Sequence, residues 1–494
     1  MSDWENSPVE EKHKCFLAQL ASILIENVFE GVRRDEPVIR WREPDHLSEI
    51  IPFDVQDEPK SQEIILEMIK NVYKFSVKTG HPYFMNQLFS GLDPYGLAGQ
   101  WLTDSLNASI YTYEVAPVVT LMEQSVISEM LKMFYGGNED QDSEIPGDGM
   151  FCPGGSYANG TAINLARFWL RPETKNYGIA GLQLVVFTSE DAHYSILKWS
   201  NMCGIGEKNV VLVATDEFGR MDVDNLKANV LKEKERGKTV FMVSATAGTT
   251  VLGAIDPLDD IADVCEKYKM WLHVDAAWGG GLIFSRVHRA LLSSIHRADS
   301  ITFNPHKLLA VPQQCSLLLT KHSGIFEAAH SRKASYLFQR DKFYPTNLDV
   351  GDKYMQCGRR ADVIKFWIMW QAKGTLGFEK HVDHLMSLSR QMKKEIERRD
   401  GFQLVTKPSF VNVCFWYVPP FLRNAKETNN YNERLHKVAP KMKEIMTKRG
   451  SLMISYQPLR EKPNFFRFVV QNSGVLASDV TYVLEELERI GKNL

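Results

Sequence analysis

The sequence predicts an α/β fold built on a mostly parallel sheet. Short apolar runs rich in β-formers recur through the middle of the chain, and helical stretches separate several of them. Strands that alternate with helices are typical of a parallel sheet covered on both faces. A length of 494 residues is ample for a large core. The predicted strands span 182–189, 209–215, 238–246, 271–277, 300–303 and 315–320.

Helices are predicted before and between these strands. Apolar residues recur at helical spacing over 15–35 and 61–78, which predicts two N-terminal helices. The segment 256–269, "DPLDDIADVCEKYK", begins with an Asp-Pro cap and ends in lysines, as helices do. The polar segments 136–149 and 423–434 are predicted to be exposed loops.

The sequence changes character near residue 373. A long charged helix is predicted at 377–399, and three strand candidates follow it: "FVNVCFWYV", "SLMISYQ" and "FFRFVV". These features predict a smaller α+β domain at the C-terminal end. The expected organisation is an N-terminal helical segment (1–106), a large α/β domain (107–372) and a small α+β domain (373–494).

Composition narrows the class of protein. Lys and Arg number 58 against 61 Asp and Glu, a net charge of −3, so charge gives no case for binding nucleic acid or an anionic membrane. No apolar run approaches the roughly 18–20 residues of a membrane span. The seven cysteines are scattered without a CxxC pair, which favours reduced thiols over disulfides or a zinc site. We expect a cytoplasmic protein without a bound metal.

Polar residues follow several predicted strands, where open α/β sheets bind ligands. His193, Thr250 and Lys307 come shortly after the strands at 182–189, 238–246 and 300–303, respectively, and Asp275 directly follows "WLHV" near the end of the strand at 271–277. Upstream, "CPGGSYANG" precedes a helical run. Glycines before a helix N-terminus form a phosphate cradle from backbone N–H groups.

These parts together fit pyridoxal phosphate. That cofactor needs a lysine to bind its aldehyde, a carboxylate beside its pyridine nitrogen, a phosphate site and a planar group on its ring. Lys307, Asp275, the "GGS" loop and His193 supply the four. Each alone has a simpler explanation: a turn, a helix cap, an ordinary histidine or a solvated lysine. Their shared order at strand ends favours the cofactor.

The motifs "NPHK", "HVDAAWGG", "PGGS" and "SATAGTT" resemble those of the group II pyridoxal-phosphate decarboxylases. That family acts on glutamate, cysteine sulfinate, aspartate and aromatic amino acids. The resemblance runs from about residue 40 to the C-terminus. It implies the aspartate-aminotransferase-like fold (fold type I) with a seven-stranded sheet, and a homodimer whose active sites are shared between subunits.

The resemblance also implies roles for single residues. Lys307 would bind the cofactor covalently, Asp275 would pair with its pyridine nitrogen, and His193 would stack on its ring. Thr250 would lie beside the cofactor and the substrate carboxylate, and Tyr336 would return a proton to Cα, which favours an amine product. The other expected cofactor contacts are Gly155, Ser156, Asn304 and His306, with Cys357 and Gly358 from the partner subunit.

Four residues bear on the substrate. Arg467 matches the carboxylate clamp of the acidic-substrate branch, and an arginine fork suits that role. Tyr111 resembles cysteine sulfinate decarboxylases, whereas Gln313, in "PQQ", resembles insect aspartate 1-decarboxylases. Gln87 is a further polar contact. The sequence thus predicts L-aspartate to β-alanine and CO2, with cysteine sulfinate to hypotaurine as secondary activity. The alternative is a primary cysteine sulfinate decarboxylase, and glutamate is less favoured.

Two other classes remain open. A pyridoxal-phosphate transaminase or lyase would share Lys307 and Asp275 but release no CO2. A non-catalytic homologue is expected to lack the lysine, the aspartate or the histidine, and all three are present. Metal-hydrolase and nucleotide-binding motifs of the HExxH and GxxxxGK[ST] types do not occur.

Overall fold

A computed structural model describes residues 7–136, 145–423 and 430–494. The chain divides into two compact units by its internal contacts. One comprises Met1–Gly91, Arg390–Val405 and Val413–Leu494, and the other comprises Leu92–Ser389 and Thr406–Asn412. The N-terminal residues thus group with the C-terminal ones, and the predicted boundaries at 106 and 372 remain a prediction.

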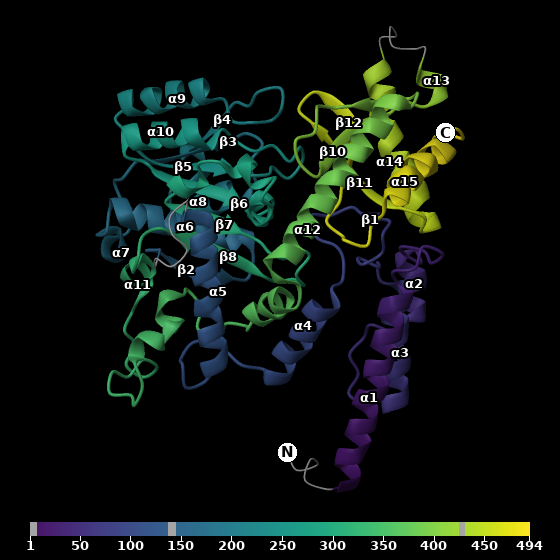
Figure 1. The fold of residues 1–494 in the computed structure, drawn as a ribbon, viewed down its shortest axis with the longest axis horizontal. Coiled ribbons are helices and arrows are strands. Elements are labelled where there is room, and N and C mark those ends of the chain that lie inside the picture. Colours follow the sequence, from purple (N-terminus) through teal and green to yellow (C-terminus); the bar gives the residue numbers. More distant parts are fainter. Residues whose placement is uncertain (1–6, 137–144, 424–429) are drawn as a thin grey trace. The chain divides into compact units, whose positions relative to one another are not determined.

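The larger unit contains a seven-stranded sheet in the order β2-β8-β7-β6-β5-β3-β4 (Figure 1). The five strands β4, β3, β5, β6 and β7 run parallel, while β8 is antiparallel to β7 and to β2. The mostly parallel seven-stranded sheet is therefore confirmed. Its strands are β2 (Asp148–Cys152), β3 (Leu184–Ser189), β4 (Val210–Val213), β5 (Thr239–Thr246), β6 (Trp271–Ala276), β7 (Ser300–Phe303) and β8 (Ser316–Thr320).

The six strands predicted in this region all form, whereas β2 was not predicted. Its sequence, "DGMFC", is short and contains a glycine, so neither length nor pattern marks it as a strand. Residues 148 and 149 belong to β2, although they end a segment expected to be a loop. The cores of both predicted polar loops, at 137–144 and 424–429, lie outside the described residues.

The register of the central strands brings their carboxyl ends together. Asp275 of β6 pairs with Thr246 of β5 on one side and with Thr302 of β7 on the other. All residues of β6 and β7 are buried, which explains their nearly continuous apolar runs. The loops that follow β5, β6 and β7 therefore leave the sheet at the same edge.

Helices cover this sheet. Helix α6 packs on β5, β6, β7 and β8, whereas α9 and α10 pack on β5 (Figure 1). The helix predicted at 256–269 is α10. The helices of this unit are α4 (Pro94–Leu106), α5 (Pro117–Tyr135), α6 (Gly155–Leu170), α7 (Thr174–Tyr177), α8 (Ser195–Met202), α9 (Val223–Glu235), α10 (Leu258–Tyr268) and α11 (Ile325–His330).

Helix α12 (Val363–Arg398) links the two units in sequence and begins earlier than the predicted 377. Gly374 interrupts it with a φ of 62° and a ψ of 175°, so two helical stretches meet there. Such a backbone conformation is accessible to glycine at little cost. The charge pattern identified only the second stretch, because the first, from Val363, is mostly apolar.

The smaller unit contains a five-stranded sheet in the order β1-β11-β12-β10-β9. Its edge strand β1 comes from the N-terminal part of the chain and pairs in parallel with β11. The three strands predicted after residue 400 are β10, β11 and β12. The strands are β1 (Phe84–Met85), β9 (Phe402–Leu404), β10 (Asn412–Tyr417), β11 (Met453–Leu459) and β12 (Lys462–Val469). The helices are α1 (Ser7–Glu30), α2 (Pro44–Ile50), α3 (Gln62–Phe75), α13 (Pro420–Arg423), α14 (Tyr431–Arg449) and α15 (Ala477–Gly491).

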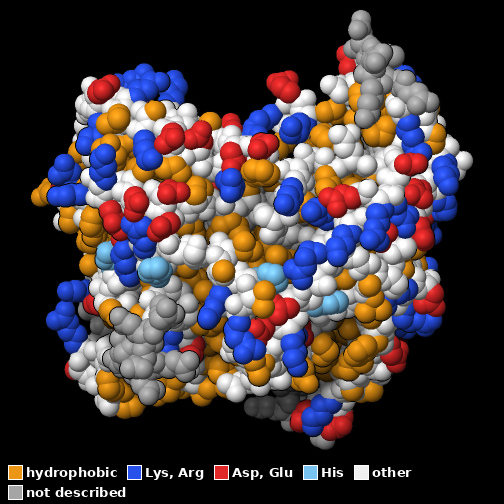
Figure 2. Space-filling model, turned by 45° about the horizontal axis from the view of Figure 1, so that its top comes forward, with side chains coloured by type: hydrophobic (Ala, Val, Ile, Leu, Met, Phe, Trp, Pro, Cys, Tyr) orange, Lys and Arg blue, Asp and Glu red, His pale blue; other side chains and the backbone are white. Residues whose placement is uncertain are grey.

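The surface carries charges of both signs. Figure 2 shows one face, on which acidic and basic side chains are interspersed with apolar ones, as the small net charge suggests. Among the described residues, no helix combines the length and the apolar character that crossing a membrane requires.

Candidate active site

A cavity of about 190 Å3 lies at the carboxyl ends of β5, β6 and β7, beside the start of α6. Eight of the ten residues predicted to contact the cofactor line it, although they come from five separate segments of the chain. The lining residues are Gly155, Ser156, Asn159, His193, Thr246, Gly248, Thr250, Asp275, Ala277, Trp278, Asn304, His306 and Lys307.

Two glycine-containing loops approach closely at this edge of the sheet. The N–H of Gly279 donates to the carbonyl of Ala247 at 2.9 Å. Gly248 has a φ of 97°, and a Cβ there would come within 2.9 Å of the Gly279 nitrogen. The "AGTT" loop after β5 and the "WGG" loop after β6 therefore need glycine to form this wall of the cavity.

The start of α6 forms one end of the cavity. No side chain caps its first turn, so backbone N–H groups there remain available to an anion. A Cβ on Gly155 would lie 2.7 Å from the Asn304 amide nitrogen, so glycine lets that amide approach the helix. Asn304 Oδ1 is buried and has no hydrogen-bond partner among the described residues. The N–H groups of an uncapped helix start suit a phosphate group, and Asn304 Nδ2 beside them can donate to one, whereas its Oδ1 can only accept.

Lys307 lies in a turn directly after β7, where its N–H donates to the carbonyl of Asn304 at 3.0 Å. Burial lowers the pKa of its amine, and the charge of Asp275 partly offsets this effect. Its neighbour His306 is buried with Nδ1 2.6 Å from the carbonyl oxygen of Cys315. Burial lowers the pKa of His306 to about 4, so its ring is neutral near pH 7.

Asp275 and His193 are held by hydrogen bonds. Asp275 accepts from Asn159 Nδ2 at 2.7 Å and from the N–H of Ala277 at 3.1 Å. His193 Nδ1 lies 2.8 Å from Ser195 Oγ, and burial lowers the pKa of the His193 ring. A buried carboxylate beside a lysine of lowered pKa is an arrangement typical of functional sites.

Comparison with known proteins decides the family. The model of the pyridoxal-dependent decarboxylase conserved domain matches residues 44–418. The chain is 49% identical to cysteine sulfinic acid decarboxylase of Mus musculus over 474 residues, 96% of this chain and 94% of that protein. It is 46% identical to acidic amino acid decarboxylase GADL1 of Xenopus tropicalis over 482 residues, 97% and 93% of the two chains. The crystal structure of mouse CSAD superimposes with a TM-score of 0.95 at 47% identity, covering 99% of this chain and 100% of that one.

The chain belongs to the pyridoxal-dependent decarboxylases. The predicted family and its fold type I architecture are thereby confirmed, and the cofactor of this decarboxylase is pyridoxal phosphate. The cavity fits that group. The start of α6 and the Asn304 amide can hold the phosphate, Asp275 can pair with the pyridine nitrogen, and Lys307 can bind the aldehyde.

The other predicted site residues do not line the cavity that contains Lys307. Cys357, Gly358 and Gln313 are exposed, Tyr336 is 80% exposed, and Tyr111 is half-buried. The segment of Tyr111 lies beside that of Cys357, because Ser109 Oγ accepts from the N–H of Arg359 at 3.0 Å. The roles of these residues remain predictions.

Arg467 and Gln87 belong to the smaller unit. Arg467 is 7% exposed, and its guanidinium donates to Ser455 Oγ at 3.1 Å and to the carbonyl of Asn86 at 3.2 Å. The carbonyl of Gln87 accepts from Gln471 Nε2 at 2.8 Å. Arg467 is thus a nearly buried cation held by hydrogen bonds within the smaller unit, and its predicted role at the substrate remains a prediction.

Several cavity residues escaped the sequence analysis. Asn159 lies three residues after Ser156, on the same face of α6, so helical spacing from "GGS" could have identified it. Trp278 donates from Nε1 to Asn412 Oδ1 at 2.8 Å, and Asn412 Nδ2 donates to the carbonyl of Thr250 at 3.2 Å. No local pattern connects Asn412 with residues more than 130 positions away.

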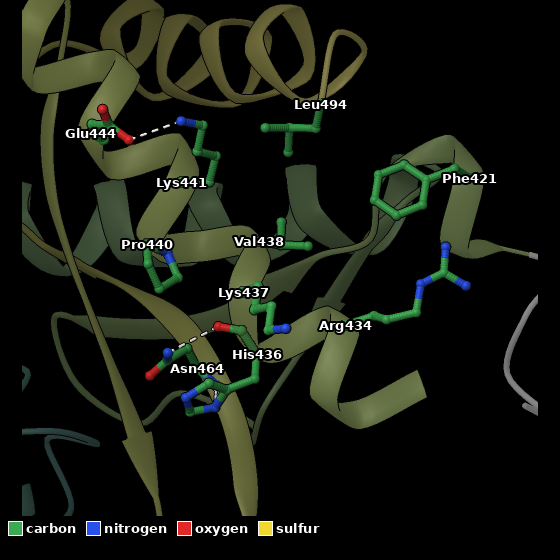
Figure 3. A pocket seen from close by; sticks show the side chains of 10 residues that line it. All are labelled: Phe421, Arg434, His436, Lys437, Val438, Pro440, Lys441, Glu444, Asn464 and Leu494. Carbon is green, nitrogen blue, oxygen red and sulfur yellow. Dashed lines mark hydrogen bonds and ion pairs between the residues drawn. The ribbon is translucent and has the colours of Figure 1, made fainter. Parts of the chain in front are cut away.

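A second cavity, of about 580 Å3, lies in the smaller unit along α14 (Figure 3). Val438, Pro440, Phe421 and Leu494 give it an apolar lining, with cationic side chains around them. Lys441 is ion-paired with Glu444 at 3.0 Å. Among the described residues its lining has no aspartate and no buried lysine, so these residues do not offer the groups that pyridoxal phosphate needs.

Proposed function

We propose that this enzyme decarboxylates acidic amino acids, with L-cysteine sulfinate to hypotaurine and CO2 as its main reaction. The observation that carries the proposal is the 49% identity to a cysteine sulfinic acid decarboxylase over 96% of the chain. L-Aspartate to β-alanine, which the sequence placed first, becomes the second candidate. The motif around Gln313 favours aspartate, but this side chain is exposed and outside the Lys307 cavity.

The residues of the larger unit are suited to the cofactor's part of the reaction. The lowered pKa of Lys307 increases the fraction of neutral amine, the form that reacts with an aldehyde. Asp275 supplies a fixed carboxylate, and the start of α6 with Asn304 Nδ2 beside it can donate hydrogen bonds to an anion. Pyridoxal phosphate, when bound, takes up the electron pair left behind when the bond between Cα and the carboxylate breaks.

The residues that act on the substrate follow from the family assignment. Tyr336 would donate its hydroxyl proton to Cα after CO2 has left, which completes the amine. Arg467 would bind the distal sulfinate or carboxylate through its planar fork, because two parallel N–H bonds match two acceptor oxygens. Such a fork would favour a substrate with an anionic side chain over an aromatic one, because an aromatic side chain offers it no pair of acceptor oxygens.

We further propose a homodimer in which each subunit completes its partner's site. Cys357 and Gly358 are exposed and do not line the cavity of their own chain. The hydrogen bond from the Arg359 N–H to Ser109 Oγ keeps the segments of Tyr111 and Cys357 together. Both segments would therefore contact the partner subunit's cavity as one surface. Tyr336 is also exposed, which is consistent with the same arrangement.

The test is product analysis of the cofactor-loaded enzyme with L-cysteine sulfinate, L-aspartate and L-glutamate offered separately. We expect hypotaurine to form fastest, β-alanine more slowly and γ-aminobutyrate slowest. β-Alanine forming faster than hypotaurine would reverse the order of the two candidates. The absence of all three amines would overturn the proposal.

Gln313→Leu refines the test of selectivity. If the Gln313 amide binds aspartate, its loss should lower aspartate turnover about tenfold more than cysteine sulfinate turnover, the value of about one hydrogen bond. Gln314→Leu is the matched control, because this neighbouring glutamine is also exposed. Equal effects of the two variants on both substrates would exclude Gln313 as the discriminating residue.

A further inference from the structure

Asn159 occupies an unusual place in the wall of the Lys307 cavity. It is 1% exposed, and its side chain takes part in three hydrogen bonds. Nδ2 lies 2.7 Å from Asp275 Oδ2 and 3.0 Å from Ser195 Oγ, and Oδ1 lies 3.1 Å from His273 Nε2. One amide thereby contacts the carboxylate assigned to the pyridine nitrogen and a serine bonded to the histidine assigned to the ring.

The chemistry of the groups at each end fixes the direction of these bonds. An ionised carboxylate only accepts, so the amide must turn Nδ2 toward Asp275 and Oδ1 toward His273. His273 Nε2 must then carry a proton and donate. Burial lowers the pKa of His273 to about 4, so the ring is neutral and its Nδ1 is an acceptor.

The hydrogen bonds on the other side of the His273 ring agree with this assignment of donors and acceptors. His273 Nδ1 lies 2.9 Å from Ser300 Oγ, whose hydroxyl can donate to it. Trp271 Nε1, which can only donate, lies 2.8 Å from the same Ser300 oxygen. Each proton between Trp271 and Asp275 thus has one consistent position, and the amide of Asn159 cannot flip without losing two bonds.

A branch leads from the same amide to the second cofactor group. Ser195 Oγ accepts from Asn159 Nδ2, so its hydroxyl proton is free to donate to His193 Nδ1 at 2.8 Å. The N–H of Ser195 also points to His193 Nδ1, at 3.2 Å. Both bonds make Nδ1 an acceptor and leave the proton of the neutral ring on Nε2.

We propose that Asn159 is a positioning residue that orients both Asp275 and His193 against the cofactor ring. The inference rests on the pyridoxal-phosphate site described above and not on the identity of the substrate. An amide is needed here because it donates twice from one atom and accepts at the other. A carboxylate at 159 would face Asp275 at about the same 2.7 Å separation without a proton between them, and two such carboxylates cannot both ionise freely.

The test measures cofactor binding by the apoenzyme without any substrate. Pyridoxal phosphate is titrated into wild type, Asn159→Ala, Asn159→Asp and Thr161→Val between pH 6 and pH 8, and bound cofactor is followed by its visible absorbance. Thr161 is the matched control: it lies two residues further along α6, is fully buried, and bonds only to the carbonyl of Tyr157 among the described residues. Thermal unfolding of each apoenzyme reports whether it is folded.

We expect Asn159→Ala to weaken cofactor binding about 10- to 100-fold at every pH, as the loss of a hydrogen bond to a charged group does. Asn159→Asp should bind most weakly at pH 8 and recover toward pH 6, since one carboxyl of the new pair takes up a proton. Thr161→Val should bind as wild type does.

Wild-type affinity of Asn159→Ala, or the same pH profile for the alanine and aspartate variants, would overturn the proposal. If Asn159→Asp does not fold, the comparison of Asn159→Ala with Thr161→Val decides alone. Because no substrate is present, a wrong substrate assignment leaves this result unchanged, and a failure here leaves the decarboxylase assignment intact.

Discussion

The residues assigned to the cofactor and those assigned to the substrate differ in how one chain holds them. Asp275, Asn304 and His306 are buried around a common cavity of the larger unit. Tyr336 and Gln313 are exposed on the same unit. A single chain thus builds the cofactor site completely enough to fix hydrogen-bond directions, whereas two of the groups proposed to act on the substrate, Tyr336 and Gln313, are presented at its surface.

The difference has a physical cause. A polar group in the interior must be paired, because burial without a partner costs free energy, and pairing fixes its orientation. The proton positions from Trp271 to Asp275 are determined in this way. Exposed residues such as Tyr336 carry no such constraint within one chain, so their positions in the working enzyme depend on what covers them.

Removing the lysine should produce the largest effect. Lys307→Ala deletes the amine that binds the cofactor aldehyde, so we expect no measurable amine product and no absorbance of covalently bound cofactor. The fold should persist, because a smaller apolar side chain leaves no charge to bury. The measurement is amine formation from L-cysteine sulfinate, together with the visible spectrum. Retained activity would show that the reaction does not use this cavity.

The predicted residues that the structure brings together around one cavity are buried or half-buried, whereas the roles of the exposed ones remain predictions. Lys307 follows β7 and Asp275 lies near the end of β6, two strands whose apolar runs predicted them, and the parallel sheet itself brings the carboxyl ends of these strands to one edge. The neighbours that orient these groups were harder to find. Asn159 looks like any helical residue, and the contact between His273 and Ser300 arises only from the pairing of β6 and β7.

The parts of the fold that sequence patterns missed depend on distant pairing. Strand β1 has two residues and forms because β11 offers it an edge. Strand β2 becomes a strand by pairing with β8, about 170 residues later. Both are too short or too irregular for a local pattern to favour one structure over another, so tertiary contacts determine them.

Loss of the tyrosine hydroxyl should give the next largest effect. Tyr336→Phe removes the proposed proton donor to Cα, and a positioned acid contributes about 10²- to 10⁴-fold to rate. We expect amine formation to fall by that factor while cofactor affinity stays at the wild-type value, because Tyr336 does not line the cavity. A parallel fall in cofactor affinity would instead indicate a structural role.

Mixed dimers test whether this tyrosine acts across the subunit interface. Dimers of Lys307→Ala subunits alone should be inactive and dimers of Tyr336→Phe subunits alone nearly so, but a dimer of one of each would contain one intact site if Tyr336 serves the partner's cavity. The two variants are mixed in equal amounts and allowed to reassociate. Half of the dimers are then mixed, and each mixed dimer has one intact site of two. We therefore expect about a quarter of the wild-type activity per subunit. No recovery from verified mixed dimers would place Lys307 and Tyr336 in the same subunit's site.

The smallest expected effect is on the pH dependence of stability. Asp256 is buried, accepts from the N–H groups of Met221 and Thr246 at 2.7 Å each, and thereby anchors the end of β5 in the cavity wall. Burial raises its pKa from 3.8 to about 7, against the lowering effect of these two N–H groups. The unfolded chain therefore loses this proton near pH 4, and the folded protein keeps it until about pH 7.

The contribution of Asp256 to the free energy of unfolding is fully present below pH 4. It declines as pH rises to about 7, by at most about 1.4 kcal/mol per pH unit for one proton. Asp256→Asn cannot ionise, so its free energy of unfolding should fall less than that of wild type between pH 5 and pH 7, even if the lost acceptor lowers it overall. Asp352→Asn is the control, because hydrogen bonds from the Ser331 hydroxyl and from the N–H groups of Arg332 and Lys333 outweigh burial and keep the pKa of Asp352 below its usual value, outside this range. The free energy of unfolding is measured by chemical denaturation at each pH. If it changes with pH equally in wild type and Asp256→Asn, Asp256 is ionised throughout this range, held by its two N–H donors despite its burial.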